Sequence, residues 1–201
     1  MAFGGVADAR AAPLLDDLFT AVKTDDLPTL RNLLDRGMDP NSSDKQGYSL
    51  LMHAAREGHI GIVRLLLDRR AKVNQQNASA ETAIMLAAFQ GQFETVKLLH
   101  SRGAALNQEG WTALHYAAFA GHASICKYLV ANNAAVDARA PNGSTPLMLA
   151  ARNGHYEVVK LLLAKADPNL KNDVGATALL WARREGHSDI AQLLQQAGAR
   201  E

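Results

Sequence analysis

The chain has 201 residues and a mass of 21.6 kDa; 48% of the residues are hydrophobic and 20% charged, which is close to the globular average and excludes a wholly disordered chain. Lysine plus arginine number 21 and aspartate plus glutamate 20, so the net charge of +1 argues against a nucleic-acid partner, which needs clustered positive charge. The single cysteine, Cys126, excludes an intramolecular disulfide framework and a cysteine-rich zinc site, and no apolar run reaches the roughly 18 residues that span a membrane.

The N-terminal residues 1–13 (MAFGGVADARAAP) are small, rich in glycine and alanine and without helical periodicity. We therefore expect a flexible leader. Because this segment has neither a charged start nor an apolar run of signal-peptide length, the default expectation is a cytoplasmic protein. An alternative stays open, since residues 9–11 (ARA), followed by residues 12–13 (AP), resemble the end of a cleaved bacterial export signal. Under that alternative the protein would act in the periplasm.

The rest of the chain repeats itself with a period near 33 residues. A glycine follows an alanine-rich segment five times, with gaps of 33, 30, 33 and 32 residues, and a hydroxyl residue stands nine positions before each glycine. The glycines are Gly58, Gly91, Gly121, Gly154 and Gly186, and the hydroxyl residues are Ser49, Thr82, Thr112, Thr145 and Thr177. Features that recur together at this spacing indicate a stack of repeated units.

Each position in the repeat has a physical reason. The hydroxyl residue can cap the first helix of a unit, the alanine pairs allow neighbouring helices to approach closely, and the glycine ends the helix in a left-handed turn. A second helix then ends at Gly37, Gly103 and Gly198 in three units. Asn133 and Arg70 replace this glycine in two others, so we expect mild backbone strain at Arg70.

These residues resemble the ankyrin repeat. The closest likeness lies in residues 110–137 (GWTALHYAAFAGHASICKYLVANNAAVD) and 143–169, and looser units lie on either side. The resemblance implies an all-α ankyrin-repeat solenoid of helix-turn-helix units with short β-hairpin fingers over residues 14–201. The expected repeats are approximately residues 14–43, 44–76, 77–107, 108–139, 140–171 and 172–201. The finger before Trp111 lacks three residues, and Arg183 and Gln195 indicate an exposed face at the C-terminal end.

The histidines and the cysteine raise the question of a metal, catalytic or redox site. Five histidines recur at repeat positions and are expected to be structural: His59, His115, His122, His155 and His187. His53 and His100 replace apolar residues on different helices, so a shared metal site is not expected. Cys126 takes a position filled by valine in other repeats and is expected to be a buried thiol. We therefore expect no enzyme, metal or cofactor; a metal or redox role through His53 or Cys126 is the remaining alternative.

Two positions on the first helix of each unit, and one at the fingertip, hold residues that the stacking of repeats does not require. The resemblance places these positions on the concave face of the stack. Tryptophan, tyrosine and arginine are enriched at binding hot spots. We therefore expect a partner-binding surface formed by Tyr48, Arg56, Phe89, Gln90, Trp111, Phe119, Arg152, Asn153 and Arg184. The alternative is that Phe89 and Phe119 pack sideways as part of the core.

The resemblance implies a protein–protein interaction module that binds a partner protein and performs no chemistry. We expect a monomer that binds an unidentified protein, with neither nucleic acid nor membrane as its partner. The alternative function, which depends on the leader, is an exported bacterial ankyrin protein that protects or regulates a partner enzyme in the periplasm.

Overall fold

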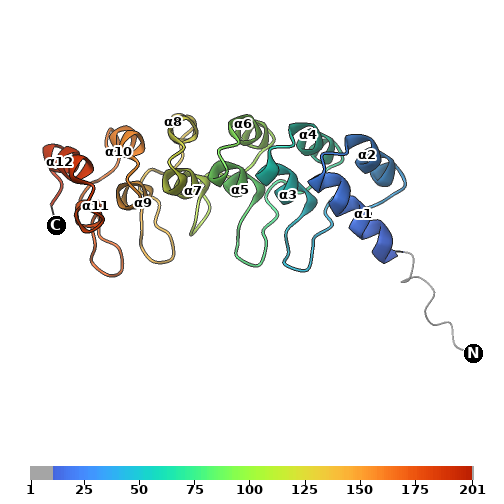
Figure 1. Ribbon diagram of the computed structural model, residues 1–201, viewed down its shortest axis with the longest axis horizontal. Coiled ribbons are helices and arrows are strands. Elements are labelled where there is room, and N and C mark those ends of the chain that lie inside the picture. Colours follow the sequence, from blue (N-terminus) through green and yellow to red (C-terminus); the bar gives the residue numbers. More distant parts are fainter. Residues whose placement is uncertain (1–10, 201) are drawn as a thin grey trace, which may run out of the picture.

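The computed structural model describes the backbone of residues 11–200 and the side chains of residues 14–200. Over this range the chain forms helices that pair along one row, which confirms the all-α fold class (Figure 1). The helices are α1 (Ala11–Lys23), α2 (Leu27–Asp35), α3 (Leu50–Glu57), α4 (Ile60–Asp68), α5 (Ala83–Phe89), α6 (Phe93–Ser101), α7 (Ala113–Ala120), α8 (Ala123–Ala131), α9 (Pro146–Arg152), α10 (Tyr156–Leu162), α11 (Ala178–Arg184) and α12 (Ser188–Gln196).

The first helix begins earlier than the sequence indicated. It starts at Ala11, inside the segment 1–13 that we expected to be a flexible leader. Alanine is the strongest helix former, and Pro13 stands in the first turn, where its missing N–H has no partner to lose. Residues 1–10 lie outside the described residues, so the leader and the export-signal alternative stay predictions.

The inner helices of neighbouring repeats pack against one another in a row, α1 against α3, α3 against α5, and so on to α9 against α11. In four repeats the predicted hydroxyl residue caps this helix by accepting the N–H three residues ahead, at oxygen–nitrogen distances of 3.2 to 3.4 Å. The four residues are Ser49, Thr112, Thr145 and Thr177. The local sequence therefore sets where each inner helix begins.

The turn between the two helices of a repeat is also a contact between repeats. The glycines that end this turn have φ between 75° and 81°. In three repeats the histidine that follows this glycine lies over the glycine turn of the repeat before it, and its Nε2 donates to a carbonyl there. The bonds are His122 to Phe89 at 2.9 Å, His155 to Phe119 at 2.8 Å and His187 to Arg152 at 3.1 Å. These histidines are structural, as predicted.

A second set of hydrogen bonds joins the loops that follow the outer helices. An asparagine Oδ1 accepts the backbone N–H of the next repeat at distances of 2.7 to 2.8 Å. The asparagines are Asn41, Asn74, Asn107 and Asn169. Both sets of bonds join the third repeat to the fourth and the fifth to the sixth, and at least one set joins each other pair of neighbours, as expected for a solenoid with nearest-neighbour contacts.

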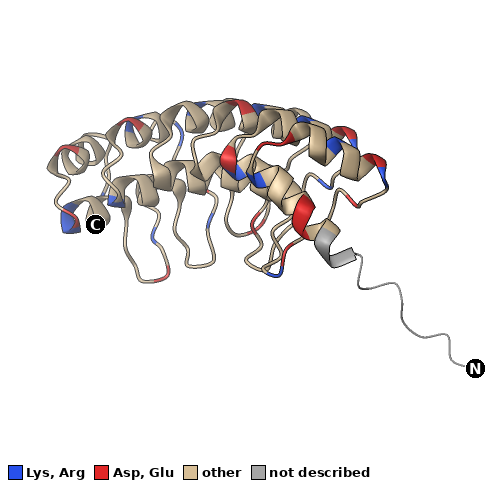
Figure 2. Ribbon diagram, turned by 45° about the vertical axis from the view of Figure 1, so that its right-hand side comes forward, with Lys and Arg blue, Asp and Glu red and all other residues tan. Residues whose placement is uncertain are grey.

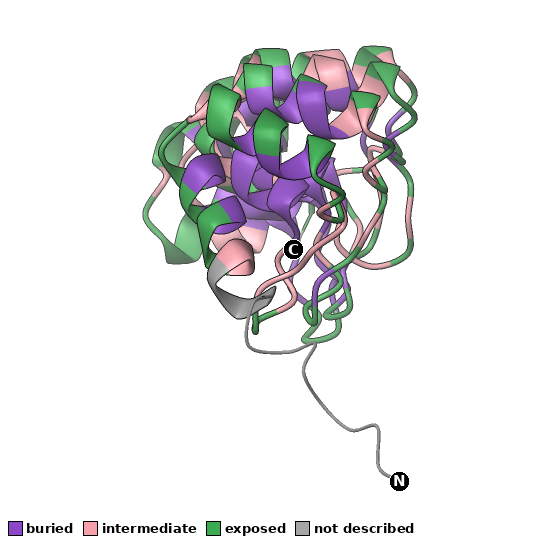
Figure 3. Cartoon of the chain, turned by 90° about the vertical axis from the view of Figure 1, so that its right-hand side faces the viewer, coloured by how far each residue is buried: buried purple, intermediate pink, exposed green. Residues whose placement is uncertain are grey.

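The hydrophobic core lies between the inner and outer layers of helices and runs from Leu18 in α1 to Ala199 after α12. Figure 3, viewed along the row, shows the buried residues facing one another between the two layers. The predicted cap residues Arg183 and Gln195 are exposed, which confirms that the last repeat presents a polar end face. Among the described residues, none of the helices combines the length and the apolar character that crossing a bilayer requires.

The row of repeats is arched, with the outer helices on the convex side and the inner helices and loops on the concave side (Figure 2). The expected hairpin fingers are mostly turns, since the isolated β-bridge found among the described residues joins Ser43 and Ser49. Residues 102–112 connect α6 to α7 and are three fewer than residues 69–82, which connect α4 to α5. Figure 1 shows that this short loop stops before its neighbours do, so the predicted notch is present.

Arg70 has a left-handed backbone, with φ of 65°, at the position where three other repeats have glycine. We expect Arg70→Gly to raise the free energy of unfolding by up to about 1 kcal/mol, because a side chain in this conformation costs about 1–2 kcal/mol and the added freedom of glycine in the unfolded chain offsets part of that gain. Urea denaturation of both proteins would measure the change. Arg64→Gly, at an exposed position inside α4, is the matched control and should lower stability by about 1 kcal/mol; a loss in both variants would contradict the prediction.

Candidate functional site

Two phenylalanines from adjacent repeats stack on the concave face. Phe89 ends α5 and Phe119 lies near the end of α7, at equivalent positions of their repeats. Their ring centroids are 6.0 Å apart with an interplanar angle of 28°, and the two residues are 39% and 46% exposed. The sequence predicted neighbouring rings, and the structure brings them together. Because both remain substantially exposed, they contact each other without being buried in the core.

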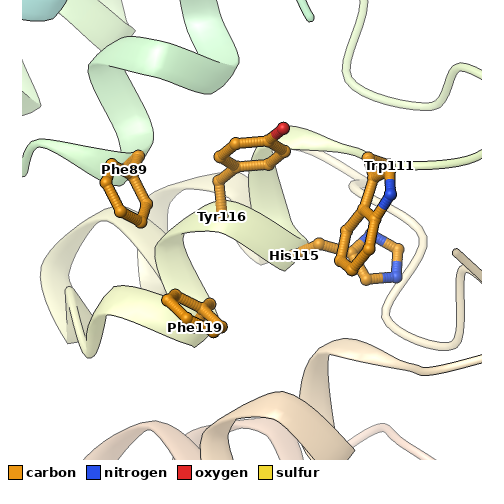
Figure 4. Close-up of a pocket in the computed structure, with 5 residues that line it drawn as sticks. All are labelled: Phe89, Trp111, His115, Tyr116 and Phe119. Carbon is orange, nitrogen blue, oxygen red and sulfur yellow. The ribbon is translucent and has the colours of Figure 1, made fainter. Parts of the chain in front are cut away.

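Two further rings extend this pair into a pocket. The ring of Tyr116 lies between Phe89 and Trp111, with centroids at 6.1 and 6.2 Å, and meets both edge to face (Figure 4). Trp111, at the end of the short loop, also packs on the ring of His115, 5.5 Å away. Together these residues line a pocket of about 180 Å³, which we call the Phe89 pocket. Edge-to-face contacts of this kind stabilise aromatic clusters beyond the area that they bury.

The hydroxyl of Tyr116 is held by the carboxylate of Glu81. Glu81 accepts hydrogen bonds from the hydroxyls of Tyr116 at 2.8 Å and Tyr48 at 3.1 Å, and from Asn77 Nδ2 at 2.7 Å. Burial, followed by the bond to Glu81, raises the pKa of Tyr116, and the bond to Glu81 is the main reason that the pKa of Tyr48 is raised. Both tyrosines therefore stay neutral donors, and three successive repeats are joined through one carboxylate.

A second pocket lies on the other side of Trp111 and Phe119. These two residues line it together with Leu149, Val174 and Trp181, and its lining also includes polar side chains, among them Asn142, Arg152 and Asp173. The pocket has a volume of about 260 Å³, and we call it the Trp181 pocket. The guanidinium of Arg152 lies 4.6 Å from the centre of the Trp181 ring, and that of Arg184 lies 5.8 Å from it. Two cations therefore lie against the Trp181 ring, which also lines the pocket.

The remaining predicted residues lie along the same face but have other contacts. Arg56 donates from Nε to Glu57 at 3.0 Å and lines neither pocket. Gln90 is exposed at the end of α5, next to Phe89. Asn153 donates from Nδ2 to the carbonyl of Phe119 at 2.8 Å, so its side chain supports the stacking of repeats. Tyr48 belongs to the site through Glu81.

The structure adds residues that the sequence-based list lacked, namely Glu81, Tyr116, Val174 and Trp181. A signal for two of them was present, because Tyr116 and Trp181 occupy a position at which other repeats have a buried leucine, such as Leu86. A ring too large for that position extends out of the core toward the concave face. Glu81 had no such signal, since its role depends on partners 33 and 35 residues away.

The residues considered for metal or redox chemistry have separate contacts. His53 Nε2 lies 2.8 Å from Asp44 Oδ2, while His100 Nδ1 lies 2.9 Å from the hydroxyl of Tyr128. Burial alone would raise the pKa of Asp44, but hydrogen bonds, foremost that with His53, lower it overall. Burial raises the pKa of Cys126 to about 12, which keeps the thiol protonated and unreactive. Within residues 14–200 the structure shows no group of three potential metal ligands.

Comparison with known proteins gives consistent results. A family model described as ankyrin repeats in three copies matches residues 70–140 and 132–200, and another described as ankyrin repeats in many copies matches residues 33–87. Ankyrin repeats are generally protein–protein interaction modules and are typically not catalytic.

Similar curated proteins share only a short stretch with this chain. The ankyrin repeat and KH domain-containing protein mask-1 of Caenorhabditis elegans is 48% identical over 59 residues, which is 29% of this chain and 2% of that protein. The E3 ubiquitin-protein ligase XBAT33 of Arabidopsis thaliana is 50% identical over 50 residues, 25% of this chain and 10% of that one. The chain thus spans a tenth or less of the length of these relatives. Since the three-copy model covers more than half of the chain, and the helix pairs, caps and turns repeat as that family requires, this chain belongs to the ankyrin repeat family.

Proposed function

We propose that this chain binds a partner protein, without catalysing a reaction, through the aromatic surface formed by Phe89, Trp111, Tyr116 and Phe119. The observation that carries the proposal is the stacked, exposed pair of Phe89 and Phe119 on the concave face. Repeat stacking does not need these rings, because the equivalent positions hold Arg56 and Arg152 in other repeats. Large exposed aromatic clusters on soluble proteins mark interaction sites.

The geometry of this surface suits a binding role. Hydrogen bonds to Glu81 and edge-to-face contacts hold Tyr116 in place before any partner arrives. A surface ordered in advance loses little conformational entropy on binding. Trp111 and Tyr116 are also of the residue types that are most enriched at hot spots. A protein partner fits the net charge of +1 better than a nucleic acid does.

The test is a paired measurement of binding and stability on Phe89→Ala and Phe119→Ala. Proteins captured by the full chain from a lysate of its source organism would be identified, and the affinity of the main one measured. Each substitution should weaken binding about thirtyfold, corresponding to about 2 kcal/mol, because truncating a hot-spot residue removes that much. Thermal and urea melts should change little, since both rings are exposed.

Ile60→Ala is the matched control, since Ile60 is 39% exposed but lies at the start of the outer helix α4. It should leave binding unchanged. If the phenylalanine variants instead lose about 3–5 kcal/mol of stability, the rings belong to the core. Unchanged binding in both variants would place the partner on another surface. Either result would overturn the proposal.

A further inference from the structure

We propose that the Trp181 pocket takes one apolar side chain from an acidic segment of the partner protein, and that a carboxylate beside this side chain pairs with Arg152. The inference rests on the proposed function and names the chemistry of the partner at a second position on the same face. The Phe89 pocket and the Trp181 pocket share Trp111 and Phe119 as a common wall. A partner segment that follows the concave face would therefore meet both.

The shape of the pocket selects an apolar side chain. Three aromatic residues, Trp111, Phe119 and Trp181, line it, and its volume of about 260 Å³ accommodates a large side chain. Val174 adds an apolar side chain at the rim, where it is 77% exposed. It lies at a fingertip position that other repeats fill with polar residues such as Gln46 or Ser79. The stack of repeats does not require a valine there, whereas contact with an apolar ligand does explain it.

The charge around the pocket selects an acidic neighbour. The inner helices α9 and α11 contain Arg152, Arg183 and Arg184 and no acidic residue. Arg152 is 52% exposed, and its contact with Glu185 is a loose 3.7 Å, in contrast to Arg56, which is bonded to Glu57 at 3.0 Å. Because the guanidinium lies on the Trp181 ring, it is positioned in advance and keeps an outer edge for a carboxylate. Such charge-assisted bonds are stronger than neutral ones.

The same features favour a peptide over a nucleic acid. Arginine and tryptophan could also hold a base and a phosphate. However, Glu185 follows α11 directly and Asp173 lies on the rim of the pocket, 3.9 Å from Arg139. A phosphate backbone carries a negative charge at every nucleotide and would pass close to these two carboxylates. A peptide needs only one carboxylate at Arg152 and can place uncharged residues beside Asp173 and Glu185. We therefore infer a protein ligand in which one or two acidic residues flank an apolar one.

The experiment is a selection of random linear peptides on the immobilised full chain, followed by affinity measurements with synthetic copies of the enriched peptides. We expect an aromatic or large aliphatic residue close to Asp or Glu in these peptides. Arg152→Gln should weaken binding about tenfold or more, since hydrogen bonds to charged groups contribute that much. Trp181→Leu should weaken it by a similar factor, because it removes a lining ring of the pocket and the support of the Arg152 guanidinium. Trp181→Leu restores the leucine of other repeats and so preserves the core. Replacing the peptide's acidic residue with its amide should weaken wild-type binding equally, yet add nothing in Arg152→Gln.

The outcomes separate this inference from the proposed function, because Phe89 lines only the first pocket and Trp181 only the second. Peptides without acidic residues, or peptides that bind Arg152→Gln and Trp181→Leu as tightly as wild type, would overturn the inference. If binding is then lost only in Phe89→Ala, the proposed function stands. If neither pocket affects binding, both fail. No enriched peptide, or tighter binding of single-stranded oligothymidylate than of any peptide, also contradicts the inference.

Discussion

Lowering the pH from about 6.5 to about 4 should reduce the free energy of unfolding by about 3 kcal/mol through His115 alone. Burial lowers the pKa of this histidine from 6.5 to about 4 in the folded protein. Below pH 6.5 the unfolded chain therefore takes up a proton that the folded chain does not, and stability falls with pH. Below about pH 4 both states are protonated and the loss ends. A shift of one unit corresponds to about 1.4 kcal/mol.

The hydrogen bonds of His115 explain why the folded protein resists this proton. The ring is fully buried, Nε2 lies 3.1 Å from the carbonyl of Ser144, and Nδ1 lies 3.2 Å from the backbone nitrogen of Thr112 and 2.9 Å from its Oγ1. The carbonyl requires a proton on Nε2, and the N–H of Thr112 requires a lone pair on Nδ1. Protonating Nδ1 would set two donors against each other in a buried site.

His115→Met is the control for this prediction. Methionine stands at the same position in three other repeats, as Met52, Met85 and Met148, and its sulfur lies 3.3 to 3.5 Å from the equivalent backbone nitrogen. Urea denaturation of both proteins across this pH range should show the difference in stability changing by about 3 kcal/mol. Contributions from other groups cancel in the difference. Parallel pH profiles would show that His115 does not titrate as the structure implies.

Gly121→Ala should lower the free energy of unfolding by about 2–3 kcal/mol. Gly121 has φ of 81°, which costs an alanine about 1–2 kcal/mol. An added Cβ would also come within 2.5 Å of the His155 ring, which reaches back from the next repeat. Moving that ring breaks its hydrogen bond to the Phe119 carbonyl, at a further cost of about 1 kcal/mol. Thermal or urea denaturation would measure the sum.

Gly103→Ala separates the cost of the backbone conformation from the cost of displacing the histidine. Gly103 has a similar φ of 88°, but nothing lies within 4 Å of an added Cβ. This variant should lose only the backbone part, about 1–2 kcal/mol, and the lower freedom of alanine in the unfolded chain offsets some of the loss equally in both variants. Equal losses in the two alanine variants would mean that the histidine contact between repeats contributes nothing to stability.

Much of the fold follows from the sequence because it depends on short-range rules. Thr145 caps the start of a helix, and Gly121 ends another helix in a left-handed turn. Arg70 and Asn133 end outer helices with the same positive φ, although they are not glycine. These features act within a few residues, so they recur visibly at each period. The start of α1 at Ala11 escaped prediction, because that helix differs from the repeated pattern.

The candidate site was only partly predictable. Phe89, Trp111, Phe119 and Arg152 lie where the repeat register placed them, and the first three line one pocket. Asn153 was expected to face a partner, yet it bonds the Phe119 carbonyl. The register shows which side of a helix a residue occupies, but it cannot show whether a side chain is used by the neighbouring repeat.

The sequence by itself determined the repeat, its caps and turns, and the row of exposed rings, since all of these are local or strictly periodic. Only the tertiary structure decided that Glu81 joins Tyr48 to Tyr116, and that Trp111 and Phe119 divide two pockets, one of which carries Arg152 on Trp181. The reason is physical. These contacts join residues from different repeats, so they depend on the spacing and twist of the stack and on side-chain orientations that no local rule specifies.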